Sequence, residues 1–163
     1  MGLEDNRVTD YIKDMRKLVG TNTLLTVGCG AIIVDKHNRI LLQRRRDSGD
    51  WCIPGGTMEL GETFIETMKR EVYEETNLKV SEPKLFGIYS GEQGFAQYPN
   101  GDKVFSIQII FYITKYKGTL TNDNDESFEH VFFYKEDIPI NLNLRQEAFI
   151  MDWKDGQTGG IIS

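Results

Sequence analysis

Three glutamates within five positions, Glu71, Glu74 and Glu75, have the spacing in this chain that most directly suggests chemistry. On a helix they lie side by side on one arc, because successive residues are about 100° apart. Two carboxylates about 6 Å apart repel by about 3 kcal/mol at an effective dielectric constant of about 20. A hard divalent cation removes that repulsion, and Mg²⁺ or Mn²⁺ suits an all-carboxylate site. The triplet thus indicates a metal site, although a solvated acidic helix face would have the same sequence.

The segment before the glutamates favours the metal site. Pro54-Gly55-Gly56 combines a stiff residue with two that tolerate positive φ and close approach of the backbone. Such a loop can turn a carbonyl toward a metal ion or backbone amides toward a phosphate. Glu62 and Arg70 are two helical turns apart, so a direct pair between them is a stretch. We expect Arg70 to pair with Glu66, four residues away, or to steady an acid across the loop.

The stretch from Gly56 to Leu78 resembles the Nudix box. Gly56, five residues, Glu62, seven residues and then Arg70-Glu71-Val72-Tyr73-Glu74-Glu75 fill every charged position of that box. One position differs, because Asn77 stands where the family usually has glycine. This position ends the helix in the left-handed conformation, which Asn adopts better than any residue except Gly. We therefore expect the site to be retained at a modest loss of stability.

The resemblance implies a Mg²⁺- or Mn²⁺-dependent pyrophosphohydrolase. Its substrate would be a nucleoside diphosphate linked to another group, as in a nucleotide or nucleotide sugar. Metal ions would polarise phosphoryl oxygens and activate the attacking water. Glu71 and Glu75 would be the leading metal ligands, and Glu74 and the carbonyl of Gly55 would be further ligands. The residues around these ligands, which would orient them, are Gly56, Glu62 and Arg70.

The general base has more than one candidate. Family members place it differently, and Glu71 is one option. The other is an acid in the loop 122–126, just before a strand that starts at Phe128. Glu126 is our choice there and Glu129 the second, although the loop could equally be an exposed acidic turn.

Candidate substrate contacts outside the box are Arg44, Arg46, Trp51 and Tyr98. In a strand Arg44 and Arg46 share one face while Arg45 points away, so the first two could contact a phosphate or form a solvated edge. Trp51 and Tyr98 could stack on a base or pack in the core. These residue types alone do not decide between the two roles.

The sequence narrows the substrate less than the reaction. ADP-ribose hydrolases of the Nudix family tend to carry a proline 15–16 residues after the box, and Gln93-Gly94 stands there instead. Tyr98 lies just outside the window in which dinucleoside polyphosphate hydrolases tend to carry a tyrosine. An alternative is a catalytically inactive Nudix domain that binds a metabolite or regulates another process, although such domains usually lose box glutamates that this chain keeps.

The elements that position these residues alternate between strand and helix patterns. The order implies an α/β fold, and the resemblance specifies an α/β/α sandwich around a mixed sheet over residues 22–153. Residues 1–21 would add an amphipathic helix (about 5–19) with a linker, and residues 154–163 a flexible tail. We predict strands at Leu24–Val34, Arg39–Arg45, Lys84–Ser90, Lys103–Tyr116 and Phe128–Tyr134, and helices at about Glu62–Thr76 and Leu142–Trp153.

Composition limits the possible partners. A net charge of −6 argues against binding nucleic acid through its phosphate backbone, but not against small phosphate compounds held through a metal ion. No apolar stretch is long enough to span a bilayer, and the acidic start does not look like a signal peptide. We therefore expect a cytoplasmic protein with a small-molecule partner. A homodimer through the N-terminal helix or the strand Lys103–Tyr116 stays open.

Overall fold

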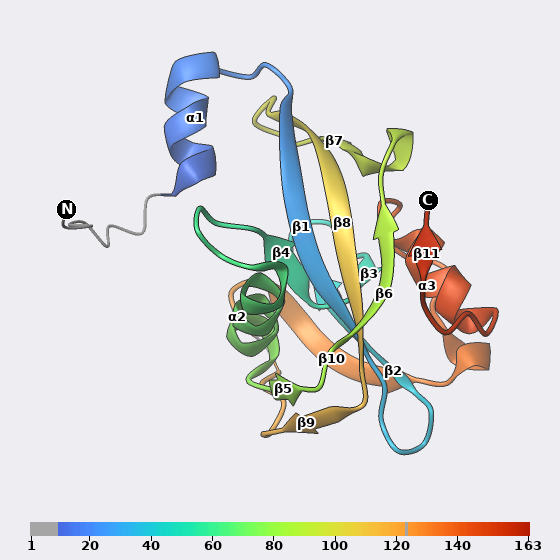
Figure 1. The fold of residues 1–163 in the computed structure, drawn as a ribbon. Coiled ribbons are helices and arrows are strands. Elements are labelled where there is room, and N and C mark those ends of the chain that lie inside the picture. Colours follow the sequence, from blue (N-terminus) through green and yellow to red (C-terminus); the bar gives the residue numbers. More distant parts are fainter. Residues whose placement is uncertain (1–9, 123) are drawn as a thin grey trace.

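The computed structural model describes residues 10–122 and 124–163. The beginning of the predicted N-terminal helix (residues 5–9) and Asp123 of the acidic loop lie outside the described residues. Among the described residues, no helix is long and apolar enough to cross a membrane. The fold is the predicted α/β type, with a mixed sheet between helices (Figure 1).

The central sheet contains both parallel and antiparallel neighbours. β1 lies parallel to β8, while β6 and β4 run antiparallel to their neighbours β8 and β1. A β-bulge interrupts the pairing of β6 with β8. Among the described residues the order is β11-β6-β8-β1-β4, with β7 also paired to β8. These strands are β1 (Leu24–Ile33), β4 (Gly55–Thr57), β6 (Lys84–Tyr89), β7 (Phe95–Gln97), β8 (Lys103–Ile113) and β11 (Ile161–Ile162).

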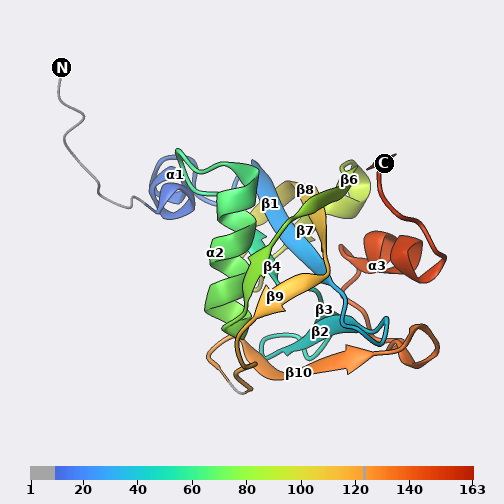
Figure 2. The same ribbon diagram turned by 60° about the horizontal axis from the view of Figure 1, so that its bottom comes forward.

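Helices α2 (Phe64–Thr76) and α3 (Glu147–Lys154) lie on opposite sides of this sheet (Figure 2). Successive side chains of β1 point to opposite faces of the sheet, so this strand contributes to the hydrophobic core on each side. Ile33 is fully buried in the cluster that includes Met68 of α2, and Ile32 in the cluster that includes Phe149 of α3. The sheet therefore holds α2 and its glutamates against an apolar layer.

Short strands complete the fold at the end of the sandwich. β10 pairs with β2, and β2 with β3, in a second sheet whose residues enter both cores. The predicted strand Lys103–Tyr116 is divided after Ile113, and its last part pairs elsewhere. The elements are β2 (Ile40–Arg45), β3 (Trp51–Cys52), β5 (Lys79–Ser81), β9 (Lys115–Lys117), β10 (Ser127–Phe133), and the 3₁₀ turns η1 (Glu92–Gly94) and η2 (Lys135–Asp137).

The two ends of α2 are closed by their own sequence. Thr63 is the N-cap and forms a reciprocal capping box with Glu66, so the helix begins after Glu62 rather than at it. Asn77 ends it in the left-handed conformation (φ 63°, ψ 15°), as we predicted, and its N–H donates to the Tyr73 carbonyl. The helix thus keeps its full length through the box glutamates without a terminal glycine.

One expectation about the chain ends needs revision. The tail of residues 154–163, predicted to be flexible, is paired: Ile161 and Ile162 lie parallel to β6, and the Ser163 N–H donates to the Ile88 carbonyl. The apolar Ile-Ile pair supplies an edge strand that the glycines before it concealed. Helix α1 (Tyr11–Val19) covers the described part of the predicted N-terminal helix and has no buried residue.

Candidate metal and active site

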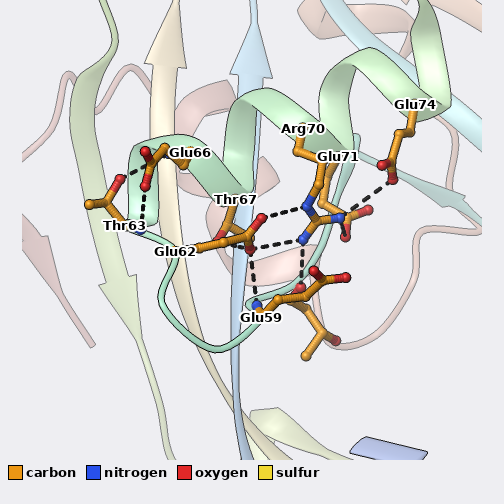
Figure 3. A network of polar contacts seen from close by, with 9 residues as sticks. Glu59, Glu62, Thr63, Glu66, Thr67, Arg70, Glu71 and Glu74 are labelled. Atoms are coloured by element: carbon orange, nitrogen blue, oxygen red, sulfur yellow. Dashed lines mark hydrogen bonds and ion pairs between the residues drawn. The ribbon is translucent and has the colours of Figure 1, made fainter. Parts of the chain in front are cut away.

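Arg70 is the centre of a polar network at the start of the glutamate cluster (Figure 3). Its Nε donates to Glu62 Oε1 at 2.6 Å, and its Nη2 to Glu62 Oε2 at 3.0 Å. Its Nη1 donates to Glu71 at 2.6 Å and reaches Glu74 at 3.4 Å. Nη2 also donates to the Thr57 carbonyl at 3.2 Å. One guanidinium thus fixes three carboxylates and the strand β4.

Arg70 does not pair with Glu66, but it does steady an acid across the loop, which was the second of the two expectations. The direct pair with Glu62, expected to be a stretch, forms because Glu62 precedes the helix. Gly61, with φ of 86°, turns the chain before the helix and brings the Glu62 carboxylate back toward Arg70. Glu62 also accepts hydrogen bonds from the Glu59 N–H and the Thr67 hydroxyl. The Arg70 hydrogen bond, above all, lowers the pKa of Glu62 to about 2.

Glu75 is the most deeply placed of the box glutamates, with 7% of its surface exposed. Its Oε2 accepts hydrogen bonds from the Gly55 N–H and from Gln43 Nε2, both at 2.9 Å. Burial raises the pKa of Glu75 well above its ordinary value, and the neighbouring Glu126 carboxyl raises it further. Burial and a neighbouring acid both penalise the charged form of a carboxyl group, and a nearby cation would offset that penalty.

Gln43 belongs to a buried network behind Glu75 that the sequence did not reveal. Its Oε1 lies 3.1 Å from the Ser127 hydroxyl and 3.1 Å from His130 Nε2, while its Nε2 donates to Glu75. Burial lowers the pKa of His130 and so favours the neutral ring. The amide therefore ties the orientation of Glu75 to strand β10. A lone glutamine between Leu42 and Arg44 gives no periodic signal by which it could have been found.

Glu71 lies directly against the glycine loop. A Cβ at Gly56 would overlap the Glu71 carboxylate, so only glycine leaves this carboxylate its place. Burial raises the pKa of Glu71, and Arg70 acts in the opposite direction. The Gly-Gly pair thus serves both carboxylates, since Gly55 donates to Glu75 and Gly56 makes room for Glu71.

One pocket brings these carboxylates together with the acidic loop. Glu71, Glu75 and Glu126 line it beside Gly55 and Gly56. The loop is held by Asn124, whose Nδ2 donates to the Glu75 carbonyl at 2.7 Å and whose Oδ1 accepts from the Glu126 N–H. We refer to this space as the carboxylate pocket. Glu129, our second choice for the base, lies outside it and pairs with Arg44 at 3.4 Å.

Comparison with known proteins agrees with this geometry. Residues 24–153 match the NUDIX domain. This chain belongs to the Nudix family. It is 35% identical over 130 residues to an ADP-ribose pyrophosphatase of Methanocaldococcus jannaschii, covering 76% of this chain and 72% of the relative.

Solved structures show the same fold. A MutT Nudix hydrolase of Burkholderia pseudomallei aligns with a TM-score of 0.67 at 23% identity, covering 78% of this chain and 97% of that one. A MutT protein of Bacillus halodurans aligns with a TM-score of 0.57 at 30% identity, covering 68% and 69%. The Nudix domain and its relatives make this chain a hydrolase of pyrophosphate bonds.

Nudix hydrolases generally use divalent metal ions, and the donors of this Nudix domain fit one. Among residues 10–122 and 124–163, no three His, Cys, Asp or Glu side chains already converge tightly enough to hold a metal ion. Arg70 holds Glu71 at 2.6 Å and lies 3.4 Å from Glu74, whose side chain is 57% exposed. The buried Glu75 and its acidic neighbour Glu126 still present hard oxygen donors whose mutual repulsion a divalent cation would relieve.

The residues predicted to contact substrate separate into two groups. Arg46 lines a cavity beside Glu75 and Glu126, whereas Arg44 does not. Both guanidinium groups lie over the Phe128 ring, 5.0 Å from its centroid for Arg44 and 4.7 Å for Arg46. Trp51 is buried in the core, edge-on to Phe133, so we no longer assign it to the substrate. Other residues line the pockets, among them Ile12 and Gln108.

Tyr98 does line a cavity next to the carboxylate pocket. Arg45 lines both spaces, although its position at the end of β2 had suggested that it points away. It forms a bidentate pair with Asp47, with distances of 2.8 and 2.6 Å. This pair keeps the Arg45 guanidinium fixed beside the site.

Proposed function

We propose that this Nudix hydrolase cleaves a nucleoside diphosphate linked to another group, a nucleotide or nucleotide sugar, with Mg²⁺ or Mn²⁺. The observation that carries the proposal is the convergence of Glu71, Glu75 and Glu126 with Gly55 and Gly56 on one pocket. The name of the archaeal relative supports the substrate class, because ADP-ribose is a nucleoside diphosphate joined to a sugar. Gln93-Gly94 stands where ADP-ribose hydrolases tend to carry a proline, so the group joined to the nucleoside diphosphate need not be ribose and is tested with a panel of compounds.

Each side chain has a distinct part in this proposal. Glu71 and Glu75 would hold the metal ion, joined by the Gly55 carbonyl and, from its exposed position, Glu74. When bound, the metal ion supplies Lewis acidity toward phosphoryl oxygens and lowers the pKa of a bound water. Arg70 orients Glu71 through its 2.6 Å hydrogen bond, and Glu62 holds Arg70 in turn.

Glu126 is the proposed general base. Glu126 lines the carboxylate pocket. Arg70 holds the Glu71 carboxylate by a hydrogen bond but forms none with Glu126 among the described residues. The backbone of its loop is fixed through Asn124, so the carboxylate is presented from a positioned segment. A base must lie within hydrogen-bond reach of the water that it deprotonates, which Glu129 on the outer side of β10 does not.

The experiment is a panel of nucleoside diphosphate and triphosphate compounds, including ADP-ribose and nucleotide sugars, with Mg²⁺ or Mn²⁺ and chromatographic detection of products. We expect Glu75→Gln to lose activity by at least about 100-fold, while Glu136→Gln, an exposed glutamate outside the site, turns over as the parent does. The proposal is wrong if no compound is hydrolysed and Glu75→Gln binds metabolites like the parent. The chain would then be the inactive, metabolite-binding type.

A pH–rate profile of Glu126→Gln tests the base separately. Loss of the lower limb of the profile is expected if Glu126 accepts the proton. Unchanged turnover and pH dependence would remove Glu126 from the mechanism and leave Glu71 as the candidate.

A further inference from the structure

The C-terminal end of α2 is bonded to the chain that leads from β9 to β10 and passes beside it (Figure 2). The last carbonyls of a helix have no partner within the helix, so donors must come from elsewhere. The Thr76 carbonyl accepts from the Thr121 N–H at 3.3 Å, and the Glu75 carbonyl accepts from Asn124 Nδ2 at 2.7 Å. A distant segment of the chain therefore completes the end of the helix that carries Glu75.

Asn77 and Gly118 are both fitted to this contact. Asn77 stands where the Nudix box usually has glycine, and its Nδ2 donates to the Thr119 carbonyl at 3.0 Å. Gly118 has a φ of 117°, and a Cβ there would come within 2.6 Å of the Asn77 carbonyl oxygen, so only glycine allows this close approach. The departure from the box thus adds a hydrogen bond that a glycine at position 77 could not make.

Asn124 links the backbone of Glu75 to that of Glu126. While its Nδ2 donates to the Glu75 carbonyl, its Oδ1 accepts from the N–H of Glu126 at 2.9 Å and from the N–H of Ser127 at 2.8 Å. A side-chain amide presents its donors and its acceptor in one plane, with fixed directions. A single rigid group therefore sets the spacing between the two backbone segments. We call residues 124–127 the Glu126 loop.

Strand β2 holds the Glu126 loop from the other side. Arg46 Nε donates to the Asn124 carbonyl at 2.6 Å, and the Arg46 N–H donates to the Glu126 carbonyl at 2.9 Å. Glu126 itself is exposed. These backbone contacts, rather than burial of its side chain, therefore determine where its carboxylate can lie.

We propose that Asn124 and Asn77 are positioning residues that fix Glu126 relative to Glu75 across the carboxylate pocket. The inference rests on the proposed function, in which Glu75 holds the metal ion and Glu126 is the general base. Both asparagines act through the backbone of the two acids. A displacement of about 1 Å in a reacting group can cost about 100-fold in rate. Loosening the Glu126 loop therefore lowers kcat and leaves substrate binding nearly unchanged.

Steady-state kinetics of Asn124→Ala and Asn124→Asp test the link to Glu75. Asn124→Asp keeps an oxygen that can accept from the Glu126 and Ser127 N–H groups, but it has no N–H for the Glu75 carbonyl. We expect kcat to fall about 10-fold in both variants, with KM within about 2-fold of the parent's value. Thermal melting shows that each variant is folded.

Asn77→Gly tests the second asparagine without disturbing the helix end, because glycine adopts the left-handed conformation at least as readily. The variant loses only the hydrogen bond to Thr119, and we expect kcat to fall about 3-fold at an unchanged KM. Asn38→Gly is the matched control. Asn38 is also left-handed, with φ of 59°, but lies in the turn between β1 and β2, so this variant should keep the parent's kcat.

Amide hydrogen exchange, followed by NMR without metal ion, tests the same contacts without turnover. The Glu126 and Ser127 amides should exchange about 10-fold faster in Asn124→Ala than in the parent. Faster exchange in a chain that hydrolyses nothing would contradict the proposed function alone.

Three results would each overturn the proposal. The first is a parental kcat in Asn124→Asp, because the link to Glu75 would then be dispensable. The second is an equal kcat in Asn77→Gly and Asn38→Gly. The third is unchanged exchange of the Glu126 and Ser127 amides in Asn124→Ala.

Discussion

Replacing Gln43 by leucine should weaken both the fold and the catalytic site. The substitution keeps the volume of a side chain that is 3% exposed but removes its three polar contacts. His130 Nε2 and the Ser127 hydroxyl lose a buried acceptor, and a buried donor without a partner costs about 1–3 kcal/mol. The Ser127 hydroxyl can rotate toward another acceptor, whereas the imidazole of His130 cannot.

The magnitude follows from these losses. The His130 N–H contributes about 2 kcal/mol, and Glu75 loses one of two donors to a charged group, worth about 1.5–3 kcal/mol. The apolar surface of leucine returns about 1 kcal/mol. We expect a net loss of about 3 kcal/mol in the free energy of unfolding, or a fall of about 6–12 °C in Tm.

Urea unfolding and thermal melting at pH 7 measure the stability, with Gln157→Leu as the control for losing an exposed glutamine. Steady-state kinetics should show kcat reduced about 10-fold with little change in KM, because a misplaced ligand affects the reaction more than substrate binding. If Gln43→Leu melts within about 1 °C of the parent and keeps its kcat, the network does not position Glu75.

Three further predictions concern the glycine loop, the Arg70–Glu62 pair and helix α1. Gly56→Ala should lower kcat about 100-fold, measured with the best substrate of the panel, because the new methyl displaces the Glu71 carboxylate. The parent should lose about 2 kcal/mol of its free energy of unfolding as the pH falls from about 4.5 toward 2. The reason is that Arg70 holds the folded-state pKa of Glu62 at about 2, below its unfolded value. In a series of urea-unfolding measurements over this pH range, Glu62→Gln should show a smaller loss. Arg16→Ala should raise KM about 5- to 10-fold with little change in kcat. Arg16 Nη1 and Nη2 hold α1 to backbone carbonyls at 2.6–3.1 Å, and α1 contributes Ile12 to the pockets. Steady-state kinetics and limited proteolysis of α1 measure the effect.

Long elements could be predicted because their periodicity repeats. The alternation of β8 has enough positions to give a consistent signal, and Asn77 ends α2 as its residue type indicates. Strands of two or three residues, such as β4 and β11, have no measurable period. Only partners from elsewhere in the chain define them, as β6 does for Ile161 and Ile162.

Spacing along one helix described part of the site correctly and part of it wrongly. Glu71 and Glu75 do lie together, as their spacing requires. Glu62 was misjudged, because the rule of helical neighbours does not apply before Thr63, where the chain turns back. Gln43 is brought beside Glu75 by the tertiary fold, for which the local sequence has no signal.

The arrangement of the acids also predicts how a metal ion changes stability. Glu75 is buried beside Glu126, and this repulsion remains in the folded protein when no divalent cation is present. An ion that binds only the folded state adds about 2.7 kcal/mol at a concentration 100-fold above its Kd. Addition of Mg²⁺ or Mn²⁺ should thus raise Tm by about 5–10 °C, and a chelator should reverse the rise.

The variant Glu75→Gln separates this effect from a general influence of salt. Without metal ion it should melt at or slightly above the parent's Tm, because a neutral amide no longer repels Glu126, while the Gly55 N–H still has an oxygen to which it can donate. With metal ion it should show little further rise, whereas the exposed Glu136→Gln should respond as the parent does. If metal ion raises the Tm of Glu75→Gln as much as that of the parent, the stabilising ion binds elsewhere, because this variant lacks the Glu75 carboxylate.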